Sequence, residues 1–372
     1  MTSKEIREIR KLYTKENCSV QRLCGCYVSG EKQKLASFSG SLLTTGEEEQ
    51  FKYLDILKKC LSGTAEKNLF NISIPLSFET SDDAFRLLSG LRESGLKNEA
   101  LLEMFYDLVI GSAEITGNFL ILLALDTYDI PGKTALGDEL SDASEESFTY
   151  MLCALCPVEL GKPGLKFSTE EGWFMAIDRD WIAGAPATGF MYPAFNDRST
   201  DLHASLWYAR NKDHFQSGLL RDLFGTELPM TAEEKKEGFG AIVSDVCQDA
   251  LDAETVKSVH ETLIQEAEII KNEPGLDPQL SKNDVRAILE KSGIADEELE
   301  RFDTSYERVL GDSSGLDINT ICSKRRFTVK NDSVELRISA DRTDLIRFEE
   351  MDGRRCAIIF LEDPVEVNGI PV

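Results

Sequence analysis

Four strand-length segments, apolar at nearly every position, constrain the fold of this chain more than any other feature of its sequence. They follow Gly117, at residues 118–126, 148–158, 173–178 and 189–195. A strand with one face in water alternates apolar and polar residues, whereas a near-continuous apolar run indicates that both faces are covered. The rest of the chain must therefore supply layers for both sides of a sheet.

The segment that precedes these strands offers covering helices. Apolar residues recur at helical spacing within residues 3–15, 51–61, 82–92 and 98–110. Thr45 and Glu48 form a capping-box pattern before the second of these. We therefore expect residues 1–212 to form an α+β domain, with a mixed or antiparallel sheet covered by helices.

The acidic charge of the chain is concentrated in its middle. The 372 residues include 41 basic and 66 acidic side chains, a net charge of −25, and residues 213–312 alone carry 10 basic and 24 acidic ones. This acidic segment has capping boxes at Thr231/Glu234 and Ser281/Asp284. Its apolar spacing predicts five consecutive helices, at residues 215–224, 231–250, 252–271, 281–292 and 297–310.

Residues 313–372 return to a period of two and predict a small β-rich unit. Asp352-Gly353 is a tight-turn signal that joins the last two strands. The alternation predicts a buried face made of Val334, Leu336, Ile338, Ile358 and Phe360. The expected division of the chain is thus 1–212, 213–312 and 313–372.

Several classes of protein are disfavoured by composition. The three histidines are not at metal-ligand spacing, and the chain has no Walker loop or dinucleotide fingerprint, so we expect no metal and no cofactor. No apolar stretch approaches the roughly 20 residues of a membrane helix, and no signal peptide precedes the first helix. Nine scattered cysteines suit a reducing compartment. We expect a cytoplasmic protein that does not bind a membrane.

Cys153 and Cys156 form a CxxC motif inside an apolar strand pattern. We expect two buried core thiols, because apolar surroundings raise a thiol pKa and make it inert. Two alternatives are a structural zinc shared with Cys18, Cys24 and Cys26, and redox chemistry.

Aspartates follow the apolar strands and offer candidate catalytic groups. They are Asp126, Asp129, Asp178, Asp180 and Asp197. Carboxylates at strand ends hold Mg²⁺ in metal-dependent hydrolases and nucleases, because hard cations need converging oxygens. The alternative is that these residues simply form turns, which Asp favours.

The C-terminal segment is rich in guanidinium groups, which suit phosphate contacts better than ammonium groups do. The candidate nucleic-acid-binding residues are Lys324, Arg325, Arg326, Arg337, Arg354 and Arg355. Because 11 acidic residues accompany the nine basic ones, the alternative is an ordinary mixed-charge surface.

Two resemblances extend this reading. The whole chain resembles a family of Firmicutes proteins catalogued as a domain of unknown function, through residues 25–28, 117–131, 152–158, 184–198 and 223–230. The order of elements over about residues 117–370 is similar to that of bacterial nucleoid-associated proteins. The second resemblance implies association with nucleic acid and no catalytic motif.

The favoured interpretation is a non-enzymatic, nucleoid-associated-like protein that binds nucleic acid through its C-terminal arginines. One alternative is a metal-dependent hydrolase or nuclease that uses the aspartates. Another is a protein-interaction scaffold whose acidic helices bind basic proteins.

Overall fold

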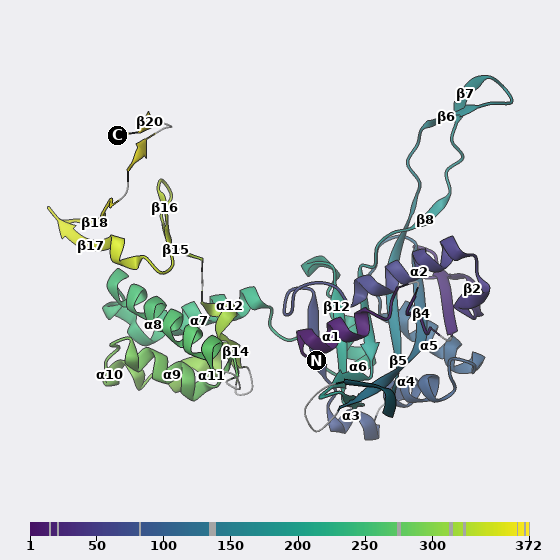
Figure 1. Ribbon diagram of the computed structural model, residues 1–372, viewed down its shortest axis with the longest axis horizontal. Coiled ribbons are helices and arrows are strands. Elements are labelled where there is room, and N and C mark those ends of the chain that lie inside the picture. Colours follow the sequence, from purple (N-terminus) through teal and green to yellow (C-terminus); the bar gives the residue numbers. More distant parts are fainter. Residues whose placement is uncertain are drawn as a thin grey trace. The chain divides into compact units, whose positions relative to one another are not determined.

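The computed structural model describes residues 1–14, 16–20, 22–81, 83–133, 139–273, 277–311, 315–322, 325–362, 364–367 and 370–371. The chain divides into two compact units, Met1–Pro229 and Met230–Val372. Figure 1 shows their elements. No helix in the described ranges is long and apolar enough to cross a bilayer.

The first unit contains an antiparallel sheet and two groups of helices. Its helices are α1 (Ser3–Arg10), α2 (Glu47–Cys60), α3 (Leu76–Ser81), α4 (Asp83–Glu93), α5 (Glu99–Ser112) and α6 (Ser217–Phe224). Its strands are β1 (Arg22–Val28), β2 (Lys34–Gly40), β3 (Leu69–Ser73), β4 (Phe119–Lys133), β5 (Glu139–Leu160), β6 (Leu165–Ser168), β7 (Trp173–Ala176), β8 (Trp181–Ala183), β9 (Thr188–Tyr192), β10 (Ala194–Asn196), β11 (Ser199–Asp201) and β12 (Ala204–Ala209).

The strand order of the main sheet is β2-β1-β4-β5-β9-β12-β3, and β8 also pairs with β5. The neighbours along this order pair antiparallel, which confirms the predicted fold class. The long β4–β5 hairpin forms its centre. The acidic and polar residues 132–147 separate two of the apolar runs, and from their composition they are predicted to form a solvated connection. The prediction is only partly correct, because β4 continues to Lys133 and β5 already begins at Glu139.

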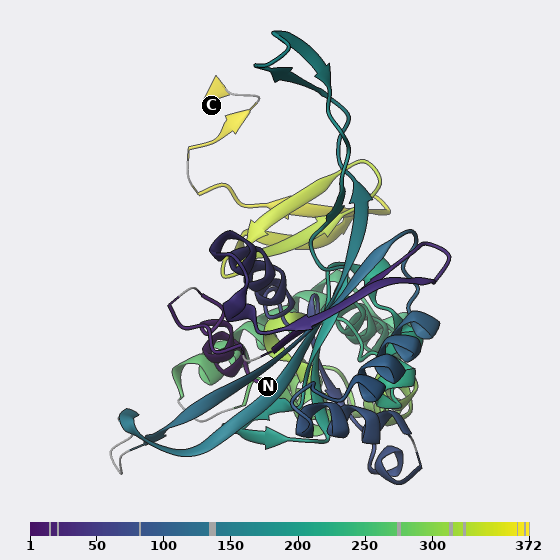
Figure 2. The same cartoon turned by 90° about the vertical axis from the view of Figure 1, so that its right-hand side faces the viewer.

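Both faces of the central strands are buried, as their apolar runs predict. Cys153 and Leu155 of β5 belong to one core, with residues of α4, α5 and α6. Leu152 and Ala154 belong to a second core, with residues of α1 and α2. Figure 2 shows the strands between these two helix groups. The same prediction is wrong for residues 173–178, because β7 belongs to a separate hairpin and every one of its residues is exposed.

The second unit combines the acidic helices with small hairpins. Its helices are α7 (Ala232–Cys247), α8 (Ala253–Asn272), α9 (Lys282–Lys291), α10 (Asp296–Leu299), α11 (Phe302–Leu310) and α12 (Ile318–Ile321). Its strands are β13 (Gln279–Leu280), β14 (Leu316–Asp317), β15 (Arg326–Lys330), β16 (Glu335–Ser339), β17 (Ile346–Met351), β18 (Arg354–Ile359), β19 (Glu366–Val367) and β20 (Ile370–Pro371).

The capping boxes of Thr231 and Ser281 are present, at the starts of α7 and α9. The one expected at Thr45 is wrong: Gly46 is the N-cap of α2, and the Thr45 hydroxyl donates to the Leu42 carbonyl instead. The unit boundary follows Pro229 because α6 packs in the core of the first unit through Leu219, Leu220 and Leu223.

The C-terminal hairpins pack on α8. The Thr343 hydroxyl donates to Glu261 at 2.6 Å, and Lys257 Nζ donates to the Ile346 carbonyl at 3.1 Å. Their small core contains Phe327, Ile338 and Ile346. The predicted buried face is therefore only partly correct: Ile338 is buried and Leu336 packs against this core, whereas Val334 and Phe360 are 52% and 47% exposed.

Candidate functional site

Two candidate C-terminal arginines lie on one face of the β15–β16 hairpin. Thr328 pairs with Arg337 and Arg326 pairs with Ser339, so Arg326 and Arg337 are diagonal neighbours. The opposite face holds Phe327 and Ile338, which pack in the small core. The arginine side chains therefore face away from the apolar side of the hairpin, and both residues are exposed.

The other candidate cations are more dispersed. Arg354 and Arg355 are exposed and follow the Asp352-Gly353 turn, where the predicted hairpin is confirmed by positive φ angles of 52° and 72°. As consecutive strand residues they point to opposite faces of β18. Arg325 is exposed just before β15, and Lys324 lies outside the described residues.

Acidic neighbours neutralise part of this cationic surface. Arg337 is paired with Glu335 at 2.8 Å, and Arg347 with Glu349 at 2.5 Å. Arg342 contacts both Asp344 and Glu362. Within the described ranges, by contrast, the side chains of Arg325, Arg354 and Arg355 form no hydrogen bond or ion pair. These three guanidinium groups can bind a ligand without displacing a carboxylate of the described residues, although Glu350 lies opposite Arg355 in the β17–β18 ladder.

The five candidate aspartates are not gathered into a site. Asp178 and Asp180 lie between β7 and β8, and Asp197 lies in the β10–β11 turn. Asp129 is exposed on β4, whereas Asp126 is 1% exposed. No three His, Cys, Asp or Glu residues of the described ranges form a group that could hold a metal ion.

Asp126 has a structural environment. Its carboxylate accepts hydrogen bonds from the Ser19 hydroxyl at 2.8 Å, the Tyr150 hydroxyl at 3.0 Å and the Thr127 amide at 2.8 Å. Burial raises the pKa of this carboxyl, while the hydrogen bonds oppose that rise. The network fastens the loop that contains Ser19 to the β4–β5 hairpin.

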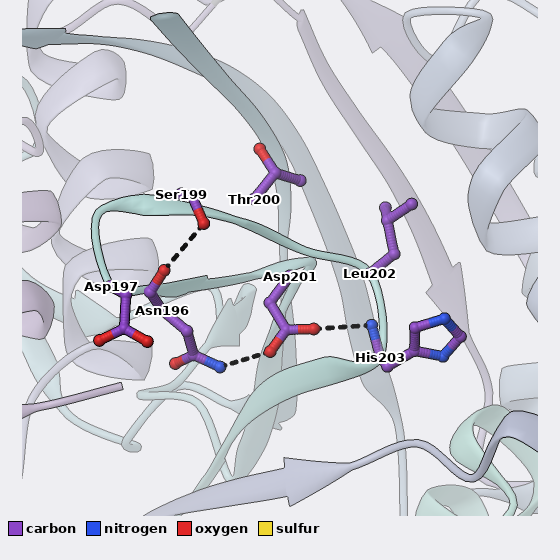
Figure 3. A pocket seen from close by; sticks show the side chains of 7 residues that line it. All are labelled: Asn196, Asp197, Ser199, Thr200, Asp201, Leu202 and His203. Carbon is purple, nitrogen blue, oxygen red and sulfur yellow. Dashed lines mark hydrogen bonds between the residues drawn. The ribbon is translucent and has the colours of Figure 1, made fainter.

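A surface pocket of about 360 Å³ lies beside Asp197, at the β10–β11 hairpin. Figure 3 shows its lining: Asp201 accepts hydrogen bonds from the Asn196 amide at 2.7 Å and from the His203 backbone at 3.0 Å. The next residue along the turn, Arg198, forms an ion pair with Glu8 of α1 at 2.8 Å. Asn196 and Asp201 thus stabilise the hairpin itself, and Arg198 holds it against α1. These interactions do not pair a nucleophile with a base.

The two cysteines of the CxxC motif are fully buried, which confirms their predicted location. They belong to different cores, Cys153 to the one beneath α4–α6 and Cys156 to the one beneath α1 and α2. Burial raises the pKa of both thiols, that of Cys156 to about 12. Because the two sulfurs lie on opposite faces of the sheet, they cannot share a ligand.

Residues 1–370 match the family described as "Domain of unknown function (DUF4317)". The chain belongs to this family. The match covers both units, so the first sequence resemblance is confirmed; the DUF4317 match gives no support to the resemblance to nucleoid-associated proteins. A comparison with curated proteins finds no match.

The sequence reasoning missed the exposed apolar hairpin of β6 and β7. Residues 173–178 were expected to form a strand in the core of the sheet, and residues 165–168 were not expected to form a strand at all, although charged residues surround both segments. These flanking residues are Lys162, Lys166, Glu170, Glu171, Asp178, Arg179 and Asp180. Charges this frequent around a short apolar strand indicate solvent exposure, and they were the available signal.

Proposed function

We propose that this protein is a non-enzymatic binding protein whose C-terminal hairpins bind nucleic acid through its phosphates. The supporting observation is the set of exposed guanidinium groups at Arg325, Arg354 and Arg355, which have no acidic partner in the described part of the chain. Arg326 and Arg337 add a second pair on β15–β16. We include Lys324 in the proposed contact set because it directly precedes Arg325 in the sequence. Arginine presents a planar fork of donors that matches phosphate oxygens.

The charge of the second unit limits how such binding can work. Residues 230–372 contain 18 basic and 32 acidic side chains, a net charge of −14. Long-range attraction to a polyanion is therefore absent, and binding depends on short-range contacts made by the hairpins. The Arg337–Glu335 pair is weak enough to exchange for a phosphate, because both side chains are solvent-exposed, at 53% and 39%.

A titration of salt dependence tests the proposal. Binding of a fluorescent duplex DNA by the full chain is measured between about 20 and 200 mM salt, and the affinity should fall as counterions are released. Changing Arg325, Arg326, Arg354 and Arg355 together to Ala should reduce the slope of log affinity against log salt by about 0.9 for each lost contact.

The matched control changes four exposed cations of the acidic helices to Ala, at Lys236, Lys271, Lys291 and Arg308. It alters net charge equally and should leave the slope unchanged. If the salt-dependence slope falls equally in the two variants, or if the wild type does not bind DNA at about 20 mM salt, the nucleic-acid proposal is contradicted.

The acidic helices support a second candidate, a protein-interaction scaffold for basic partners. Residues 230–312 contain 21 acidic and nine basic side chains, so this surface attracts cationic segments. Titration with a decalysine peptide tests it: saturable binding that survives about 150 mM salt is expected, and weak binding without saturation would contradict it.

A further inference from the structure

A β-ribbon, here called the arm and defined as residues 161–182, extends from the end of the β5–β8 pair. Figures 1 and 2 show it projecting away from the sheet of the first unit. Backbone hydrogen bonds continue along it, from Gly161 to the Asp180 carbonyl at 2.8 Å and from Ile177 to the Gly164 carbonyl at 3.0 Å. The β6–β7 ladder then completes the arm. It is therefore a regular hairpin and not an open loop.

Large apolar side chains cover this arm. Six of them are between 55% and 73% exposed: Leu165, Phe167, Trp173, Phe174, Trp181 and Ile182. Isolated exposed apolar residues are normal on protein surfaces, but so many large ones on one short ribbon indicate an interaction site.

The strand register explains where the densest part of this surface lies. Phe167 pairs with Phe174 and Leu165 pairs with Ala176, so these four side chains share one face of the hairpin. The two phenylalanine rings contact each other edge to face, with centroids 5.3 Å apart. A two-stranded hairpin with an uncovered apolar face is at best marginally stable in water. The arm is therefore expected to be covered in the assembled protein.

We propose that a second copy of this chain covers the arm, so that two arms pair across a two-fold axis. The six exposed side chains together offer on the order of 700 Å². These side chains lie on both faces of the arm, because Trp173 and Phe174, and likewise Trp181 and Ile182, are consecutive strand residues. A standard stable interface needs roughly 800 Å² from each partner, so the arm supplies nearly the whole of it when the second arm wraps around both faces. In a two-fold pair of wrapped arms the same surface meets itself, and the apolar groups on both faces find apolar neighbours.

Charge argues against the polyanionic occupants. The arm, residues 161–182, contains four acidic and three basic side chains, so it has no cationic surface that would attract a polyanion. The proposal is independent of the function assigned to the C-terminal hairpins, which lie in the other unit.

Sedimentation velocity of the full chain over a range of concentrations tests the proposal. The wild type should shift from the mass of one chain, 41.5 kDa, to twice that value as concentration rises through the micromolar range. The variant Leu165→Ser/Phe174→Ser should weaken the dimer by about 30-fold or more, because the two changes remove apolar anchors from the centre of the interface.

The matched control is Leu43→Ser/Leu76→Ser, which alters two side chains of the same unit that are each 69% exposed and outside the arm. It should dimerise like the wild type, and near-ultraviolet circular dichroism should show that both variants are folded. A wild type that stays monomeric at about 100 µM, a variant that dimerises normally, or a control that is equally impaired would overturn the proposal. Co-sedimentation of a monomeric wild type with phosphatidylcholine vesicles would assign the arm to a membrane instead.

Discussion

Strand β5 and the arm are both rich in large apolar side chains, and they have opposite environments. Leu152, Cys153 and Leu155 of β5 are fully buried, because helices cover both faces of the sheet. Phe167 and Phe174 of the arm are more than half exposed. Apolar character therefore fixes the tendency to form a strand, whereas burial depends on which other element reaches it. Where no element of the same chain covers an apolar strand, a partner is expected.

Truncating one phenylalanine in each region should give the largest difference. Phe190 of β9 is 1% exposed and packs against Trp207 and Phe224. Phe190→Ala should lower the free energy of unfolding by about 3–5 kcal/mol, since it leaves a cavity in a closely packed core. Phe174→Ala should change it by less than about 0.5 kcal/mol. Urea denaturation at submicromolar protein concentration, where the chain is monomeric, measures both.

Similar losses in the two phenylalanine variants would show that the arm packs on its own unit, and the contrast between the two regions would then fail.

A pair of glycines sharpens the same contrast. A methyl group added at Gly189 would collide with the carbonyl oxygen of Cys153 and lie 2.6 Å from Cys60 Sγ, so the sheet would have to move. Gly189→Ala should therefore destabilise the protein by about 3 kcal/mol. Gly172 of the arm has open space around it and a φ of +63°, so Gly172→Ala should cost only about 1 kcal/mol of backbone strain. Thermal melts of both variants test this, and equal costs would refute it.

Asp126 should give a smaller, pH-dependent effect within the core. Burial raises its folded-state pKa above the unfolded value, so the folded state binds more protons between those two values. The free energy of unfolding contributed by this group therefore falls as pH rises through that interval. Asp126→Asn cannot ionise, so its stability relative to the wild type should increase between about pH 4 and pH 7. Urea denaturation of both proteins at the two pH values measures it, and an unchanged or decreasing difference would contradict the assigned cause.

Much of the fold of both units can be predicted from the sequence wherever local patterns and packing agree. The apolar runs that contain Leu123 and Leu155 mark strands covered on both sides, and the capping boxes of Thr231 and Ser281 mark two later helices. Residues 173–178 have a similar apolar run, and the apolar pattern itself does not say whether a covering layer is within reach. Only the flanking charges, such as Glu171 and Asp178, indicate that this strand is exposed. The environment of β7 was therefore mispredicted.

The candidate sites are harder to predict for the same reason. Arg326 and Arg337 share a face because β15 and β16 pair in a particular register, and that register depends on side chains such as Ile338 finding the small C-terminal core. Asp126 and Asp178 both follow apolar runs in the sequence, yet one is buried in a hydrogen-bond network and the other lies on the exposed arm. Sequence position alone does not separate these outcomes.

Tryptophan accessibility tests most directly the claim that the arm is exposed in one chain and covered by a second. Of the three tryptophans, Trp173 and Trp181 lie on the arm at 73% and 57% exposure, and Trp207 is fully buried in the core. At nanomolar protein concentration, acrylamide should quench the fluorescence of two tryptophans. At the concentrations where the mass doubles, most of this quenching should disappear, because the second chain covers both side chains. The variant Leu165→Ser/Phe174→Ser should keep both accessible throughout. Quenching of the wild type that does not change with protein concentration would contradict the account.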